Sequence, residues 1–417
     1  MPSPVTLPTA TIQDDFTTVL SEVHAGLIPS ENIWLSFYKE GEPSVHGKVT
    51  ITLHEQDRDR VELNGTGGVE LRRTSQLRYT ARCLGLGIDS VDFISPTEIY
   101  ADPSHSDERH PRQITAFAIS NELLVTTLLD GTLSVYNLPP PSDSASSSYP
   151  VPSTHTIQPV VASKLHKSVI NALEISSGTS SHPLLASAGS DFCINLTPLP
   201  TTLGIPPLLT PFLSLRHTRP VSALLPLLTD SLLSASTDGW LHMWDIRTGT
   251  PTAKWMALKP PVALAASTED ADGTVWVAFA DGNVHLLDRR TGTLAEKWAA
   301  GASARAIAAS ADGRDIALGA VDGMVALYDV RGGSTRERWK RGGAQIESIS
   351  FAPGSRVVVG SEDGLPYVVD FMKEGNRAGL HINELVFGNV EAVRALRVSG
   401  GFAYITGDGG VVRKYQL

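Results

Sequence analysis

The chain has 417 residues, enough for about two or three average domains or for one large repeat domain with an added module. Its formal net charge is −10, and residues 1–110 hold 17 acidic and 9 basic side chains, so most of the acidic excess lies in the first quarter. This balance argues against nucleic-acid binding, which selects for lysine and arginine, and favours a basic protein partner.

The sequence lacks targeting and disulfide motifs, which bears on the cellular compartment of the protein. The opening "MPSPVTLPTATIQDDF" lacks the basic and apolar segments of a signal peptide, and no run of eighteen apolar residues predicts a membrane span. The two cysteines, Cys83 and Cys193, form no C-x-x-C motif and no disulfide framework. We therefore expect a protein of the reducing cytoplasm, with the nucleus as a second location and no contact with membrane.

Residues 1–100 are expected to form a small N-terminal module of α+β or all-β type. In "TIQDDFTTVLSEVHAGL" (11–27) the apolar residues stand at helical spacing, at Phe16, Val19, Leu20 and Val23. The segments "NIWLSFYKE", "GKVTITLHE" and "GVELRRTS" predict strands. We expect a separate domain that leads through a polar linker (100–113) into the rest of the chain, where it could donate an outer strand to the last sheet.

Residues 101–417 contain a repeat with a period near forty residues. Aspartates of tight turns, most of them followed by glycine, mark the repeats: Asp130, Asp191, Asp238, Asp281, Asp322, Asp363 and Asp408. Each lies between two strand-like runs, and a further strand precedes each pair. Three visible strands and a less regular fourth predict a four-stranded blade, which cannot bury both faces alone. We therefore predict an all-β fold in which a seven-bladed, closed β-propeller follows the N-terminal module.

The first two turn aspartates are 61 positions apart, the widest spacing in the series. The excess is explained by "PPPSDSASSSYPVPSTH" (139–155), which the composition predicts to be a flexible surface loop of the first blade.

One repeat contains "STDGWLHMWDIRTGT" (236–250), and it resembles a WD40 repeat closely enough to assign a hydrogen-bonded set inside one blade. That set comprises His217, Ser236 (with Ser234 as the alternative serine), Asp238 and Trp244. We interpret it as structural, because a buried carboxylate needs such partners. A catalytic Ser/His/Asp arrangement is disfavoured, since the chain has no nucleophile elbow. We find no metal or cofactor motif and predict a protein that is not an enzyme.

In WD repeats the Asp-Gly turn and the loop between successive blades lie on one face, which suits the display of a surface to a protein partner. We expect acidic side chains there to make this face more acidic towards the later blades. The candidates are Glu362, Glu384 and Glu391, with the turn aspartates Asp281, Asp322 and Asp363 adding to the field. The loops near "KLHKS" and "SLRHTRP" are basic.

Two segments at the ends of the chain resemble a specific family. "IQDDFTTVL…ENIWLSFYKEGEPSVHGKVT" (12–50) and "DGGVVRKYQL" (408–417) resemble the proteasomal ATPase-associated factors, WD-repeat assembly chaperones of the proteasome regulatory particle. The resemblance implies a monomeric, non-catalytic chaperone that binds the C-terminal domain of a base ATPase subunit through that subunit's basic surface, alongside other assembly factors, and blocks premature docking on the core particle. The alternative is a WD40 scaffold or substrate receptor in a ubiquitin ligase or a ribosome-assembly complex.

Overall fold

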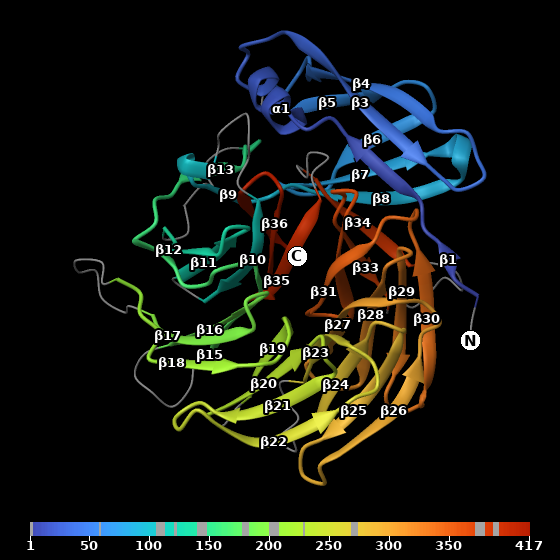
Figure 1. Ribbon diagram of the computed structural model, residues 1–417. Coiled ribbons are helices and arrows are strands. Elements are labelled where there is room, and N and C mark those ends of the chain that lie inside the picture. The colour runs from blue at the N-terminus through green and yellow to red at the C-terminus, as the bar shows by residue number, and fades with distance from the viewer. Residues whose placement is uncertain are drawn as a thin grey trace.

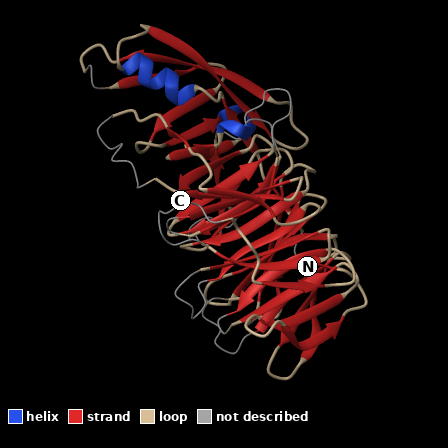
Figure 2. Cartoon of the chain, turned by 60° about the vertical axis from the view of Figure 1, so that its left-hand side comes forward, coloured by secondary structure: helices blue, strands red, loops and turns tan. Residues whose placement is uncertain are grey.

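The computed structural model describes residues 3–57, 60–105, 113–120, 123–139, 148–176, 183–199, 208–227, 230–267, 274–371, 380–386 and 392–417. Within them the chain forms eight β-sheets and one α-helix, in an all-β, propeller-like arrangement (Figure 1). Figure 2 shows that strands, joined by loops, make up most of the molecule and that α1 lies at one end of it. No helix in the described part of the chain has the length and apolar character needed to cross a membrane.

The N-terminal region supplies nine strands and the helix. Their bounds are β1 (Val5–Thr6), β2 (Thr9–Ile12), α1 (Phe16–His24), β3 (Ser30–Tyr38), β4 (Val45–Leu53), β5 (Val61–Gly65), β6 (Val69–Arg73), β7 (Arg78–Cys83), η1 (Leu84–Leu86), β8 (Ile88–Ile94), β9 (Glu98–Ala101) and η2 (Pro103–His105). The predicted helix is confirmed, and its four apolar residues are buried against the sheet β2-β3-β4-β5 and the strands β6 to β8.

Seven further sheets, which we call ring sheets one to seven in chain order, make up the rest. The first three contain β10 (Ile114–Ile119), β11 (Leu123–Leu128), β12 (Thr132–Asn137) and β14 (Val161–Lys164); β15 (Ile170–Ser176), β16 (Leu184–Gly189), β17 (Cys193–Pro198) and β18 (Leu213–Arg216); and β19 (Val221–Leu227), β20 (Ser231–Ser236), β21 (Trp240–Asp245) and β22 (Thr250–Met256).

Ring sheets four to seven follow the same antiparallel order. They contain β23 (Pro261–Ala265), β24 (Thr274–Phe279), β25 (Asn283–Asp288) and β26 (Thr293–Ala299); β27 (Ala304–Ala309), β28 (Asp315–Ala320), β29 (Met324–Asp329) and β30 (Ser334–Lys340); β31 (Ile346–Ala352), β32 (Arg356–Ser361), β33 (Tyr367–Asp370) and β34 (His381–Leu385); and β35 (Val393–Ser399), β36 (Phe402–Gly407) and β37 (Val411–Gln416) with β9 as the fourth strand. β9 is thus an outer strand that the N-terminal region supplies to the last sheet, as the sequence analysis considered possible.

The first strands of the ring sheets contact one another in chain order, and β35 also contacts β10, which closes the ring. Seven apolar clusters lie between neighbouring sheets, the last of them joining sheet seven to sheet one. The second strand of each sheet is buried on both faces. Close approach requires small residues there: a Cβ on Gly319 would lie 2.4 Å from the Ile346 side chain, and one on Gly360 would lie 2.5 Å from Val393.

The N-terminal module is not separate from the ring, contrary to our expectation. Strand β8 pairs in parallel with β34, so that β8, β7 and β6 extend ring sheet six to seven strands, and β1 pairs with the outer strand β30 of sheet five. The physical reason is that an outer strand exposes unpaired backbone groups, which another strand of the same chain can satisfy.

The insertion at 139–155 also differs from the prediction of a flexible loop. Residues 140–147 lie outside the described residues, but Tyr149 is buried in the core of the N-terminal module and its hydroxyl accepts a 2.8 Å hydrogen bond from the Val61 N–H. The next residues form β13 (Ser153–Thr156), which pairs in parallel with β9. The insertion is therefore anchored at two points, and its tyrosine is the residue in a Pro/Ser-rich run that could have indicated this.

The turn glycines provide a test of the ring's packing. Gly282 (φ +86°) and Gly301 (φ +81°) both need a left-handed backbone, but a Cβ on Gly282 would lie 2.2 Å from the Ala302 carbonyl oxygen, whereas one on Gly301 meets nothing within 4 Å. Both changes to alanine carry a cost of about 1 kcal/mol for positive φ. We expect Gly282→Ala to lower the free energy of unfolding by about 1–3 kcal/mol more than Gly301→Ala, because backbone must also move. Urea unfolding of the two variants checks this, and equal losses would contradict it.

Candidate interaction face

One end of the ring, which we call the turn face, is formed by the turns between second and third strands and by the segments that link successive sheets. The turns have three residues in six sheets and five (362–366) in ring sheet six. The strand register places both at the same end: Trp240, which begins β21, lies opposite Met256, which ends β22. Links and turns are also bonded to one another. The Ala257 N–H donates to the Gly239 carbonyl at 2.9 Å. The turn face is therefore held by backbone contacts, which leaves its side chains available for recognition.

Most turn aspartates serve the turn itself. The Oδ1 atoms of Asp130, Asp191, Asp238, Asp281, Asp322 and Asp363 accept hydrogen bonds of 2.9–3.2 Å from the backbone N–H two residues later. The residue after the aspartate has a positive φ, which glycine adopts at no steric cost. Ring sheet two places Phe192 there, at φ +70°.

The seventh turn differs from the prediction by one residue. The glycine with positive φ is Gly410, so Gly409 stands where the other turns have aspartate, and Asp408 precedes it. Asp408 instead accepts two hydrogen bonds from Arg394, at 2.8 and 3.0 Å. In "GDGG" either Gly409 or Gly410 could occupy the turn position with positive φ, and an alignment on Asp-Gly selects Gly409, which is wrong.

The predicted hydrogen-bonded set of ring sheet three is present in part, and its serine is the alternative one, Ser234. His217 Nε2 lies 2.7 Å from Ser234 Oγ, and Trp244 Nε1 donates to that oxygen at 2.8 Å. Ser236, which we had assigned to the set, donates to the Arg219 carbonyl at 3.3 Å. In a strand, residues two apart share a face, so the sequence could not distinguish the two serines.

Asp238 is hydrogen-bonded to Thr218 and not to His217, with which its interaction is only electrostatic. It accepts a short hydrogen bond from the Thr218 hydroxyl and a 3.0 Å bond from the Trp240 N–H. Burial acts to raise the pKa of Asp238, but these hydrogen bonds outweigh it and hold that pKa below its ordinary value. The carboxylate is thus charged at neutral pH and committed to the link between two strands.

Ring sheet two forms the more complete set, although its sequence lacks the tryptophan. His166 Nδ1 lies 3.0 Å from Asp191 Oδ1, and its Nε2 lies 2.9 Å from Ser187 Oγ. Thr197 occupies the register position of Trp244, opposite Leu185. The order Asp–His–Ser matches that of a hydrolase triad, but Ser187 is 0% exposed and His166 is 2% exposed. A substrate carbonyl has no path to this hydroxyl, so the set serves to hold the sheet together.

The predicted acidic residues do not all reach the surface. Glu362, Asp281 and Asp322 are exposed on the turn face, and Asp363 beside them is half-buried. The prediction that Glu384 is exposed is wrong. Glu384 is 3% exposed, accepts a hydrogen bond from the Ala10 N–H at 3.0 Å and lies 2.8 Å from Arg341. Strand β2 covers it, and no sequence pattern placed β2 there. Glu391 lies outside the described residues.

A chain of ion pairs that sequence reasoning missed runs along the first strands of ring sheets five to seven. Glu347, whose side chain is 6% exposed, lies 3.0 Å from Arg305 and 3.6 Å from Arg394, which in turn binds Asp408. In all seven sheets the register shifts at this second position of the first strand. The sequence signal for this position is a charged residue followed by a small residue and then a large apolar residue, as in "RAI", "ESI" and "RAL".

The remaining charges divide the turn face. Exposed basic residues lie in the links around ring sheets two to four, at Lys167, Arg219 and Lys259. Exposed acids follow in sheets four to six, at Asp281, Asp322 and Glu362. Exposed apolar side chains interrupt the basic part, among them Phe192 and Leu258. The face is thus polarised along the ring and can discriminate a partner by charge.

No protein-family model matches this chain, and no curated protein matches it significantly. In the part of the chain that the structure describes, no three histidine, cysteine, aspartate or glutamate side chains come together to hold a metal ion.

The two serines of ring sheet three can be compared directly. Both are 0% exposed, and both lose only one oxygen on substitution by alanine. Ser234→Ala leaves Trp244 Nε1 and His217 Nε2 without a partner, so we expect it to lower the free energy of unfolding by about 2–3 kcal/mol. Ser236→Ala removes a long bond to the Arg219 carbonyl and a hydrogen bond to Asp238, which keeps Thr218 and the Trp240 N–H as partners, so it should cost less, roughly 1 kcal/mol. Urea unfolding measures both, and a larger loss for Ser236→Ala would overturn the assignment.

The buried His217 predicts a dependence of stability on pH. Burial, with His242 stacked 4.3 Å away, lowers the pKa of His217 to about 4 from its ordinary 6.5. Between these values the unfolded chain takes up a proton that the folded chain does not, so stability is lost as pH falls through this window. Between pH 7 and pH 5 wild-type protein should lose about 2 kcal/mol more than His217→Gln, as followed by urea unfolding. Parallel losses in the two proteins would contradict the prediction.

Proposed function

We propose that the chain is a seven-bladed WD40 propeller whose N-terminal module is fused to one blade, and that it acts as a non-catalytic assembly chaperone for the base of the proteasome regulatory particle. The resemblance of residues 12–50 and 408–417 to the ATPase-associated factors suggests the family. The observation that carries the proposal is the row of exposed acids Asp281, Asp322 and Glu362 at three successive turns. These acids suit a basic protein surface such as the C-terminal domain of a base ATPase subunit.

The mechanism we propose is steric, with electrostatic selection. A rigid ring bound to the ATPase C-terminal domain blocks contact with the core particle until assembly is complete. The ring is well suited to this because its turn face is held by backbone bonds and needs no rearrangement before binding. The exposed acids raise the encounter rate and reject partners of like charge, whereas the basic links set the orientation.

The first experiment asks which partners the protein has. Affinity purification of the tagged chain should recover free base ATPase subunits and other assembly factors without core particle. Recovery of cullin adaptors or of pre-ribosomal particles would replace the proposal by the ligase-receptor or ribosome-assembly alternative.

The second experiment tests the acids directly. The triple variant Asp281→Lys, Asp322→Lys, Glu362→Lys should weaken binding of the ATPase C-terminal domain about tenfold or more, and binding by wild-type protein should weaken as salt rises. The control variant Glu31→Lys, Asp89→Lys, Glu296→Lys makes the same change in net charge at exposed acids away from the turn face. Calorimetry measures both, and equal weakening by the two triples, or salt-insensitive binding, would reject the acidic face.

A further inference from the structure

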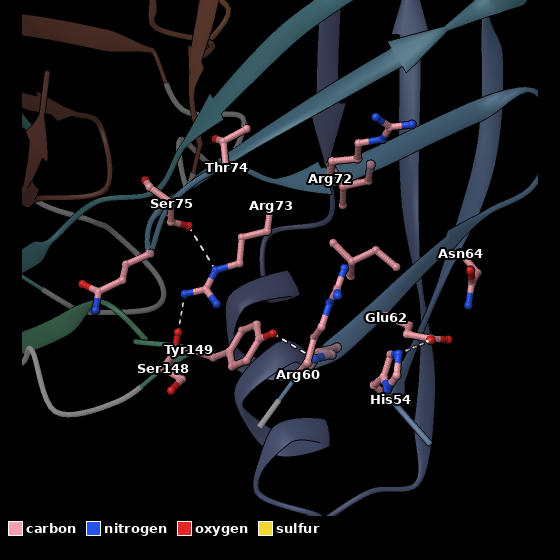
Figure 3. A pocket seen from close by; sticks show the side chains of 14 residues that line it. His54, Arg60, Glu62, Asn64, Arg72, Arg73, Thr74, Ser75, Ser148 and Tyr149 are labelled. Atoms are coloured by element: carbon pink, nitrogen blue, oxygen red, sulfur yellow. Dashed lines mark hydrogen bonds and ion pairs between the residues drawn. The ribbon is translucent and has the colours of Figure 1, made fainter. Parts of the chain in front are cut away.

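The N-terminal module contains an open groove between two sheet edges. Strand β5 ends the sheet β2-β3-β4-β5, and β6 ends the extended ring sheet six. The two strands are in close contact where the chain turns, since a Cβ on Gly65 would lie 2.0 Å from the Val69 carbonyl oxygen. Beyond that point a cavity of about 800 Å³ separates them, lined by residues 60–64, 71–76, His54, Ser148 and Tyr149 (Figure 3).

The hydrogen-bond register shows which backbone groups of β5 face the cavity. The His54 N–H donates to the Arg60 carbonyl, and the Thr66 N–H donates to the Lys48 carbonyl, so the even-numbered residues of β5 bond to β4. In an antiparallel pair the residues between them point their N–H and C=O groups the other way. The backbone of Leu63 therefore faces the groove, and the described strands include no ladder partner for it there.

Strand β6 presents the same arrangement from the opposite wall. The Leu84 N–H donates to the Gly68 carbonyl, and the Thr74 N–H donates to the Arg78 carbonyl, so the even-numbered residues of β6 bond to β7. The backbone of Leu71 and Arg73 consequently faces the groove. Two edges that have no strand partner among the described residues thus border one cavity, an arrangement that natural proteins usually cover.

The chain itself shows that the groove accepts groups from outside the two sheets. One end is closed by Tyr149, whose hydroxyl accepts the groove-facing Val61 N–H at 2.8 Å. Arg73 donates to the Ser148 carbonyl, and its guanidinium lies 4.1 Å from the centre of the Tyr149 ring. Figure 3 shows Arg73 reaching between Ser75 and Ser148. The remainder of the groove, along Leu63 and Leu71, is not filled by these contacts.

The side chains define what would fill it. Val61 and Leu71 are buried on the core side and Leu63 packs against the same core, so one face of an added strand would meet apolar groups. The charges around the opening are mainly positive, from Arg60 and Arg72 together with Arg73. The acid Glu62 lies 3.6 Å from His54, and Arg72, with a 69% exposed side chain, lies 3.6 Å from Glu70.

We propose that this groove binds an extended peptide segment of a protein partner, with apolar residues alternating with acidic ones, that pairs as a strand with the open edges of β5 and β6. Strand addition supplies affinity through main-chain hydrogen bonds, and alternate side chains supply specificity. The apolar residues face Val61, Leu63 and Leu71, and the acidic residues face Arg60 and Arg72. This site is independent of the turn face and of the proteasomal proposal.

The test uses the full chain and a fluorescein-labelled peptide with the sequence Glu-Val repeated three times. Fluorescence anisotropy should show saturable binding, and hydrogen exchange at the Leu63 and Leu71 amides should slow in the complex. The same peptide with every backbone nitrogen methylated keeps its charge but loses strand pairing at both edges, and we expect it to bind at least about tenfold more weakly. Equal binding of the two peptides, or no binding by either, would overturn the proposal.

Two variants separate the site from general charge attraction. Arg60→Glu with Arg72→Glu should weaken the unmethylated peptide about tenfold or more. The control, Arg247→Glu with Arg290→Glu, makes the same charge change at arginines whose side chains are 76% and 77% exposed in ring sheets three and four. The control should bind like wild type. Equal weakening in both double variants would overturn the site, and circular dichroism verifies that each remains folded.

Discussion

A sheet with apolar residues on both faces has to be covered twice, and this constraint organises the whole molecule. Each ring sheet buries one face against the preceding sheet and the other against the next, which gives seven separate clusters between neighbours. A linear stack would leave two faces open, so the sheets close on themselves. The contact between β35 and β10 closes the ring, and β9 completes the seventh sheet, where Glu98 lies 3.2 Å from Lys414 in a buried ion pair.

The same constraint explains why the polar residues whose arrangement resembles a catalytic triad stabilise the sheets instead. Ser187 and Ser234 lie on strands packed between two sheets, and His166 lies buried in the link beside them, so each polar atom needs a partner inside the fold. Their hydrogen bonds tie the links between sheets to the strands, as when His166 contacts both Ser187 and Asp191. The side chains and backbone edges that remain accessible to a partner lie at the ends of the ring and in the N-terminal module.

The N-terminal module shows how the chain treats exposed strand edges. Two of them are covered within the chain, β34 by β8 and β30 by β1, and the neighbouring strand β2 covers Glu384. Among the described residues, the contacts that cover the edges of β5 and β6 lie at one end, at Tyr149. The module is thus both a brace for ring sheets five and six and a second surface with recognition chemistry of its own.

The sequence by itself determined what depends on local pattern: the helix at Phe16–His24, the repeat, and the turns in which aspartate accepts a backbone N–H. Local spacing could not choose between Ser234 and Ser236 or between the two glycine registers at 408–410, because neighbouring residues satisfy the same pattern. Only the tertiary structure decided that Glu384 is buried, that Tyr149 anchors the insertion and that β8 extends a ring sheet. These depend on contacts between residues far apart in sequence, whose pairing is selected by edge satisfaction and packing across the whole fold.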